Sequence, residues 1–95
     1  MSKVDDLISR LLAKPSGNRC SDIVHGLESL GYTVKSRKAP HHKVYGHKGT
    51  RHHSGGSFNC GHGKNPHVLS VYVKNIVSEL ERAKSDLEEF LGDKS

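Results

Sequence analysis

The histidines of this chain are its most chemically informative residues. Seven of the eight lie in three short stretches, PHHKVYGH (40–47), RHH (51–53) and CGHGKNPH (60–67). A histidine titrates near neutral pH, so it can accept a proton from a 2′-hydroxyl of RNA or return one to a leaving 5′-oxygen. Nearby Lys or Arg side chains can stabilise the charge that develops on the phosphoryl group. These residue types therefore suit RNA cleavage without a cofactor.

Zinc binding is the alternative use of a histidine cluster. A structural zinc site needs four ligands, which usually come in close pairs such as CxxC and HxxxH. Cys20 and Cys60 are 40 residues apart, and Cys60 with His62 is the only tight Cys/His pair in the sequence. Folding could bring other histidines together, but no spacing specifies it. We therefore expect no metal site, and a small metal-binding protein is a lower-ranked alternative.

Charge is distributed unevenly along the chain, whose formal net charge is +5. Residues 29–78 contain eight Lys or Arg and no Asp or Glu, whereas residues 79–95 contain six acids and three bases. A basic block of this kind attracts a phosphate backbone, which supplies most of the sequence-independent affinity for nucleic acid. We therefore expect residues 29–78 to form an RNA-binding surface. The candidates for phosphate contacts are Lys35, Arg37, Lys43, Lys64 and Lys74.

Three stretches have the apolar spacing that is typical of helices, and glycines or a Pro-Ser-Gly-Asn break follow them. The helices are expected over residues 4–12, from Cys20 or Ser21 to Gly31, and from about Ser70 to Gly92. Gly92 is well placed to end the last helix in the left-handed conformation that glycine adopts easily.

Between the second and third helices the apolar period changes to two, which indicates strands. Strands are expected over residues 32–37, 42–47 and around 58–60, with a turn at 38–40 and loops at 48–57 and 61–66. The order α-α-β-β-β-α predicts an α+β fold, in which helices pack on an antiparallel sheet. Three helices can cover only one face of the sheet. The other face, or its loops, should therefore be free for a ligand.

The strands separate the histidines into two groups. A histidine on a strand is held more rigidly than one on a glycine-rich loop, because the strand fixes its backbone. This favours His41, His42 and His47 as candidates for acid/base chemistry over the histidines of the two loops.

The span from Arg19 to Arg82 resembles the HicA family of toxin–antitoxin mRNA interferases. DIVHGLESLGY (22–32) is similar to the family's first helix, which ends in a Gly-Phe or Gly-Tyr pair. HKVYGH (42–47) fits its signature of a histidine, two residues and an aromatic, followed by a second histidine. CGH (60–62) and SVYVKNI (70–76) are similar to the end of its sheet and the start of its closing helix.

The resemblance implies a double-stranded-RNA-binding-domain-like core of order α-β-β-β-α. It implies an endoribonuclease of the toxin class whose catalytic residue is His42, with His41 as the nearest rival. Tyr45, the aromatic residue of the signature, would either stack on RNA or pack in the core. The implied partners are mRNA and a HicB-type antitoxin protein, and the implied location is the cytoplasm. A non-catalytic RNA-binding module of the same fold is the main alternative.

The length of 95 residues is enough for a single domain. We expect residues 1–14 to add an N-terminal helix, residues 19–82 to form the HicA-like core, and residues 83–92 to extend the last helix. The apolar stripe of this extension must pack on something, and the stripe of residues 4–12 has no assigned partner. The two stripes are therefore expected to pair, either within one molecule or across a homodimer.

The cysteine count and the hydropathy of the chain bear on its location. Two cysteines are too few for a disulfide scaffold and are typical of a reducing compartment. No apolar run reaches the ~20 residues that span a bilayer, and the first residues lack the apolar segment of a signal peptide. We therefore expect Cys20 and Cys60 to be ordinary, partly buried thiols of a cytoplasmic protein.

Overall fold

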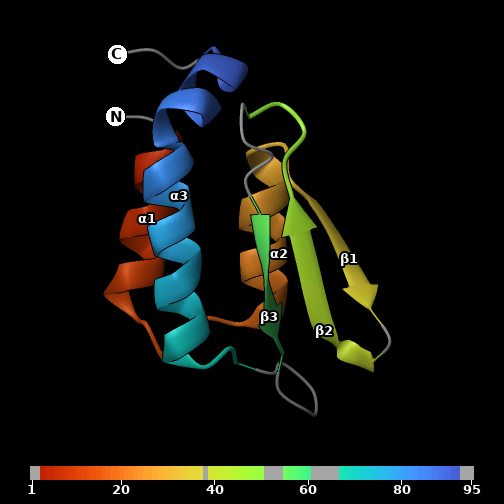
Figure 1. Cartoon of the computed structure of the whole chain (residues 1–95). Coiled ribbons are helices and arrows are strands. Elements are labelled where there is room, and N and C mark those ends of the chain that lie inside the picture. The colour runs from red at the N-terminus through yellow and green to blue at the C-terminus, as the bar shows by residue number, and fades with distance from the viewer. Residues whose placement is uncertain (1–2, 38, 51–54, 61–66, 93–95) are drawn as a thin grey trace.

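The structure is a computed structural model that describes residues 3–37, 39–50, 55–60 and 67–92 (Figure 1). These residues form three helices and one sheet of three strands, so the α+β class predicted from the sequence is confirmed. In chain order the elements are α1 (Lys3–Ala13), α2 (Cys20–Ser29), β1 (Thr33–Arg37), β2 (Ala39–Gly46), β3 (Gly55–Asn59) and α3 (Ser70–Leu91).

The sheet is antiparallel, with the strand order β1-β2-β3. Tyr45 of β2 is the partner of Val34 on β1 and of Gly56 on β3, which fixes the register across the sheet. The starts of β2 and β3 differ most from the expected ones, and β2 ends at Gly46, one residue before His47. β2 begins at Ala39, inside the expected turn, and β3 begins at Gly55, inside the expected loop. Backbone pairing with a neighbouring strand determines these boundaries, and glycine-rich sequence gives no alternating pattern from which to predict it.

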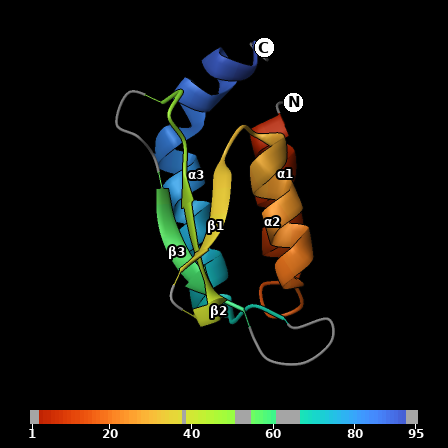
Figure 2. The same cartoon turned by 90° about the vertical axis from the view of Figure 1, so that its right-hand side faces the viewer.

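α2 and α3 pack on one face of the sheet, as Figures 1 and 2 show from two directions. α2 packs on β1 and α3 packs on β3. Buried side chains from both layers meet between them, among them Leu27 of α2, Tyr45 and Phe58 of the sheet, and Leu80 of α3. Strand alternation directs the remaining side chains to the opposite face, which we call the open face. It carries Thr33, Lys35, Arg37, His42, Val44, Gly46, Gly55, Ser57 and Asn59.

The N-terminal helix pairs with the C-terminal helix within one molecule, so the expected pairing of their apolar stripes is confirmed. Val4 and Leu7 are buried in the same core as Leu87 of the extension. At the helix surface, Lys84 Nζ lies 2.9 Å from Asp5 Oδ1, and this hydrogen bond raises the pKa of Lys84. The contact of α1 with α3 therefore combines apolar burial with one exposed ion pair.

Glycines follow the ends of α2 and α3, as predicted from the sequence. Gly31 follows α2 with φ +96°, and Gly92 caps α3 with φ +67°. The start of α2 differs from the expectation, because its N-cap is Arg19 rather than Cys20 or Ser21. Arg19 makes no side-chain cap hydrogen bond. Its backbone instead forms an isolated antiparallel bridge with His67, which fixes the entry into the helix.

Cys20 and Cys60 form a disulfide, so the expectation of two ordinary thiols is wrong. Their Cα atoms are 5.5 Å apart although they are separated by 40 residues in the sequence. The chain reaches this arrangement because residues 18–19 run beside residues 67–68, where the Val68 amide donates to the Asn18 carbonyl at 2.9 Å. This brings the start of α2 next to the end of β3. The cysteine count therefore no longer supports a reducing compartment.

A helix that spans a membrane needs about 20 mostly apolar residues. None of the helices in the described ranges combines the length and the apolar character needed to cross a bilayer.

Candidate functional site

His42 lies on the open face, on the central strand of the sheet, and is half-buried. Its Cα partner on β3 is Asn59, and His42 Nδ1 lies 2.7 Å from Asn59 Oδ1. The amide oxygen can only accept a hydrogen bond, so the imidazole must donate from Nδ1. In the neutral ring, Nε2 then carries the lone pair. The pairing therefore presents His42 as a proton acceptor at Nε2.

Tyr72, near the start of α3, extends this arrangement by one residue. Asn59 Nδ2 donates to the Tyr72 hydroxyl oxygen at 2.9 Å. Because that oxygen accepts, the phenolic hydrogen can be donated to another acceptor. His42, Asn59 and Tyr72 thus form a hydrogen-bonded chain that joins β2, β3 and α3, which we call the histidine chain.

Sequence reasoning missed both Asn59 and Tyr72. The signal for Asn59 was its place in the third strand. Its position opposite His42, however, depends on the backbone pairing of β2 with β3. Tyr72 was noted only as part of the SVYVKNI stretch, and nothing in its spacing indicates that the first turn of a helix reaches an edge strand.

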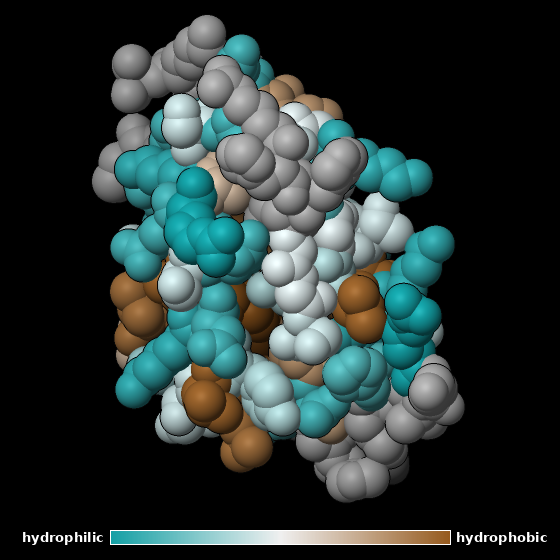
Figure 3. Space-filling view, in the orientation of Figure 1, coloured by the Kyte–Doolittle hydropathy of each residue, from teal (hydrophilic) through white to brown (hydrophobic). Residues whose placement is uncertain are grey.

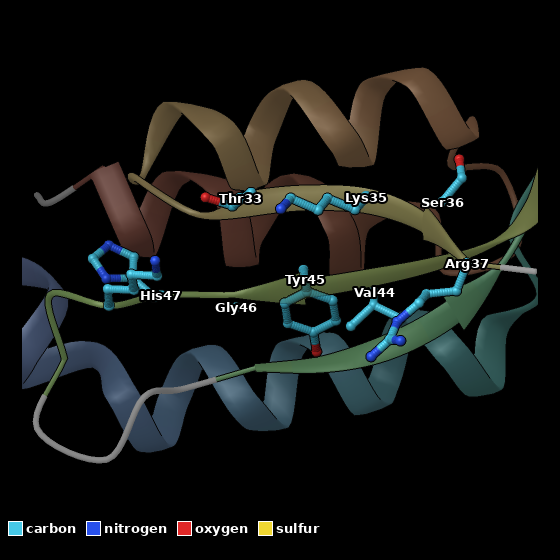
Figure 4. A pocket seen from close by; sticks show the side chains of 9 residues that line it. Thr33, Lys35, Ser36, Arg37, Val44, Tyr45, Gly46 and His47 are labelled. Atoms are coloured by element: carbon cyan, nitrogen blue, oxygen red, sulfur yellow. The ribbon is translucent and has the colours of Figure 1, made fainter.

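A groove of about 680 Å³ runs along β1 and β2 on the same side of the sheet (Figure 4). The described residues that line it are Thr33, Lys35, Ser36, Arg37, Val44, Tyr45, Gly46, His47 and Lys48. Figure 4 shows the Arg37 side chain extending from β1 over β2, where its guanidinium group lies beside Val44. The surface over β3 has intermediate hydropathy in Figure 3, in keeping with its sequence GGSFN.

The structure brings two of the expected phosphate contacts onto the face that carries His42. Lys35 and Arg37 are exposed on β1 and line the groove. Lys48, which was not among the expected contacts, also lines it and is exposed. Since residues 29–78 contain no Asp or Glu, this part of the sheet carries no carboxylate to oppose the three cations.

Two other expected basic contacts, Lys43 and Lys74, are not brought beside His42. Lys43 follows His42 on the strand, so its side chain lies on the opposite face, where Nζ donates to Ser36 Oγ at 2.7 Å. Lys74 is exposed but lies about 200° around α3 from Tyr72, given two residues at 3.6 residues per turn. Lys64 falls outside the described residues.

Tyr45 packs in the core rather than presenting a ring to RNA. It is 4% exposed, and its ring centroid lies 5.6 Å from that of Tyr32 and 6.0 Å from that of Phe58. Burial, and then the negative charge of Glu79, raises the pKa of Tyr45. A ring enclosed in this way has no face on which a base could stack, so the packing alternative is the correct one.

His47, one of the three strand-borne candidates, has a structural role. It is 2% exposed, and its ring contacts the rings of Tyr32 and Phe90 edge to face. His47 Nε2 donates to the Leu30 carbonyl at 2.8 Å, and Nδ1 accepts from the Gly49 amide at 3.0 Å. Both ring nitrogens are therefore used, and His47 cannot exchange protons with a ligand.

The remaining histidine candidates cannot be placed. The side chain of His41, and the whole of His52, His53 and His62, lie outside the described residues. In the part of the chain that is described, no three His, Cys, Asp or Glu side chains gather in a way that could hold a metal ion.

Comparison with known proteins gave no relative: no family model, curated protein or solved structure matches this chain. The similarity to the HicA family therefore rests on the sequence motifs given above.

Proposed function

We propose that this chain is an mRNA interferase of the toxin class, a metal-independent endoribonuclease in which His42 is the acid/base. The observation that carries the proposal is the hydrogen bond from His42 Nδ1 to Asn59, on a face that also presents Lys35 and Arg37. It combines an oriented proton acceptor with cations on strands that contain no Asp or Glu. Both are required to cleave a polyanion by proton transfer.

The reaction uses the 2′-hydroxyl of the substrate as its nucleophile. His42 Nε2 removes the 2′-hydroxyl proton while the 2′-oxygen attacks the adjacent phosphorus. The bond from phosphorus to the 5′-oxygen then breaks, the 5′-oxygen takes up a proton from water, and protonated His42 returns its proton to solvent. The products are a 2′,3′-cyclic phosphate and a 5′-hydroxyl, and no oxidant or metal is needed. Lys35 and Arg37 stabilise the negative charge that the phosphoryl oxygens gain in the transition state.

The topology also supports the proposal. From Cys20 to Leu91 the described elements follow the order α-β-β-β-α, which is the order that the HicA resemblance implies for a double-stranded-RNA-binding-domain-like core. On this proposal the open face is the active face, and a HicB-type antitoxin neutralises the enzyme by covering it. The proposed location is the cytoplasm on the ground of the mRNA substrate alone, since the Cys20–Cys60 disulfide is more typical of an oxidising compartment.

The decisive experiment measures cleavage of RNA by the purified protein in EDTA. We expect cleavage with 2′,3′-cyclic phosphate ends, and we expect His42→Ala to abolish it. The matched control is His25→Ala, which removes an exposed histidine from α2 and should leave the rate unchanged. Induction of the two variants in cells should give growth arrest for His25→Ala but not for His42→Ala.

Each other outcome favours a specific alternative. A His42→Ala protein that cleaves at the normal rate would transfer the catalytic role to His41. Binding of RNA without cleavage would favour the non-catalytic RNA-binding module, since the described site contains one histidine that can act in acid/base chemistry. Activity that requires zinc would favour the metal-binding alternative.

A further inference from the structure

Gly46, in the groove at the end of β2, is a glycine that the fold does not require. A Cβ atom built at Gly46 meets no heavy atom of the described residues within 4 Å, and its φ is outside the left-handed region. The neighbouring glycines differ. A Cβ at Gly55 would collide with the Tyr45 carbonyl, and one at Gly56 would lie 2.8 Å from the Tyr45 hydroxyl. Packing therefore explains Gly55 and Gly56 but not Gly46.

A glycine within a strand reduces stability, because the unfolded chain has more conformational freedom to lose. The cost relative to alanine is about 0.5–1 kcal/mol. Glycine in a strand often marks a place where a ligand or another backbone approaches closely. At Gly46 no other part of the described chain occupies that space, so the position is open to a ligand.

The groups around Gly46 indicate the chemistry of that ligand. Thr33, its Cα partner on β1, lines the groove with its hydroxyl-bearing side chain, and Lys48 lines it two residues beyond Gly46. Lys35 follows Thr33 at the second position along β1, so its side chain shares the open face. Arg37 follows the register shift between Ser36 and Arg37, and it also lines the groove. A hydroxyl donor followed by spaced cations fits a chain of phosphodiesters, with one anion for each nucleotide.

The described lining of the groove offers no exposed aromatic ring on which bases could stack. The rings among its described lining residues belong to Tyr45 and His47, which are 4% and 2% exposed. Proteins that hold single strands by their bases rely on exposed aromatic side chains for this purpose. The described lining therefore suits recognition of the sugar–phosphate backbone.

We propose that this groove binds the ribose–phosphate backbone of RNA, with the backbone in close contact with Gly46 and the bases directed away from the sheet. The inference rests on the proposed function for the identity of the ligand as RNA. It adds the position of the strand, the role of Gly46, and two contacts, Thr33 and Lys48. Recognition of this kind is independent of base identity.

The test measures binding of a fluorescent 2′-O-methyl RNA oligonucleotide, which cannot be cleaved because its 2′-oxygen has no proton. Gly46→Val should weaken binding by about tenfold or more, while the melting temperature stays the same or rises because valine favours strands. The matched control is Ser57→Val, which places the same side chain on the open face at an exposed position that does not line the groove. Normal binding by a folded Gly46→Val protein overturns the proposal.

Two further arms test the charges and the bases. Lys48→Gln should reduce the slope of log Kd against log salt by about one unit. The control is Lys14→Gln, at an exposed residue directly after α1, which should leave the slope unchanged. An oligomer of the same length with abasic sugars should bind within about threefold of the intact one. A loss of about tenfold or more with the abasic oligomer would show that the bases are read, which contradicts the proposal.

These measurements are separate from catalysis. Binding that depends on Gly46 in a protein that does not cleave RNA would support the groove and reject the nuclease. Cleavage that depends on His42, in a protein whose RNA binding is unchanged by Gly46→Val, would support the nuclease and reject the groove.

Discussion

Removal of the Cys20–Cys60 disulfide should destabilise the protein strongly. The bond joins the first residue of α2 to the residue that follows β3, and it closes a loop with a sequence separation of 40. In the chain-entropy model, a cross-link of this span restricts the unfolded chain and stabilises the fold by about 4 kcal/mol near room temperature. A domain of this size has a total stability of about 5–15 kcal/mol. The disulfide is therefore a large part of what keeps the chain folded.

The variant to measure is Cys20→Ala with Cys60→Ala, because alanine leaves no thiol and adds no buried hydroxyl. Urea denaturation followed by circular dichroism gives its free energy of unfolding. A loss of about 4 kcal/mol corresponds to a fall in melting temperature of about 15–30 °C for a domain of this length. Treatment of the unsubstituted protein with a reducing agent should give a similar loss, and the same agent should not affect the alanine variant.

A change of less than about 1 kcal/mol in both experiments would refute the reasoning. It would mean either that the two sulfurs are not bonded in solution or that the unfolded chain is already restricted by residual structure. Alkylation of the protein unfolded in denaturant without a reducing agent, followed by mass spectrometry, separates these two cases, because bonded cysteines do not take up the label whereas buried free thiols become accessible.

Two further predictions concern the histidine chain and the core. Asn59→Leu should convert His42 from the Nδ1–H tautomer toward the Nε2–H form that a neutral histidine side chain prefers in water, as read from the ¹⁵N shifts of its ring. An Nε2–H ring in the unsubstituted protein would contradict the assigned amide orientation. Burial holds the pKa of Tyr45 above its usual 10.0, so its stabilising contribution is complete below that pH and is lost as pH rises toward the folded pKa. Relative to Tyr45→Phe, the protein should lose up to about 1.4 kcal/mol of stability per pH unit above pH 10. Equal slopes of unfolding free energy against pH for the two proteins would contradict this prediction.

The helices were predictable because each carries a continuous local signal. The stripe from Val73 to Leu87 repeats over several turns, and Gly92 ends it as expected. The pairing of α1 with α3 followed from the same physics, since two apolar stripes without partners have to bury each other. The strand boundaries were predicted less well, because the pairing of β3 depends on β2 rather than on its own sequence.

The candidate site was predictable in part. His42, Lys35 and Arg37 could be selected because strand position and charge are local properties of the sequence. The partnership of His42 with Asn59 could not, since it depends on the register between two strands. The disulfide was missed for a similar reason. The number and spacing of the cysteines do not indicate which segments of the chain the fold brings together.

The position of β1 at the edge of the described sheet has a consequence for self-association. An edge strand offers backbone hydrogen-bonding groups to a strand of a second molecule, and long charged side chains such as lysine discourage this pairing. Lys35 and Arg37 project from this strand, so like charges repel two copies that approach edge to edge. A polyanion bound in the groove neutralises both charges and removes that repulsion. Solutions of the protein saturated with nucleic acid should therefore aggregate more readily through β1 than the free protein does.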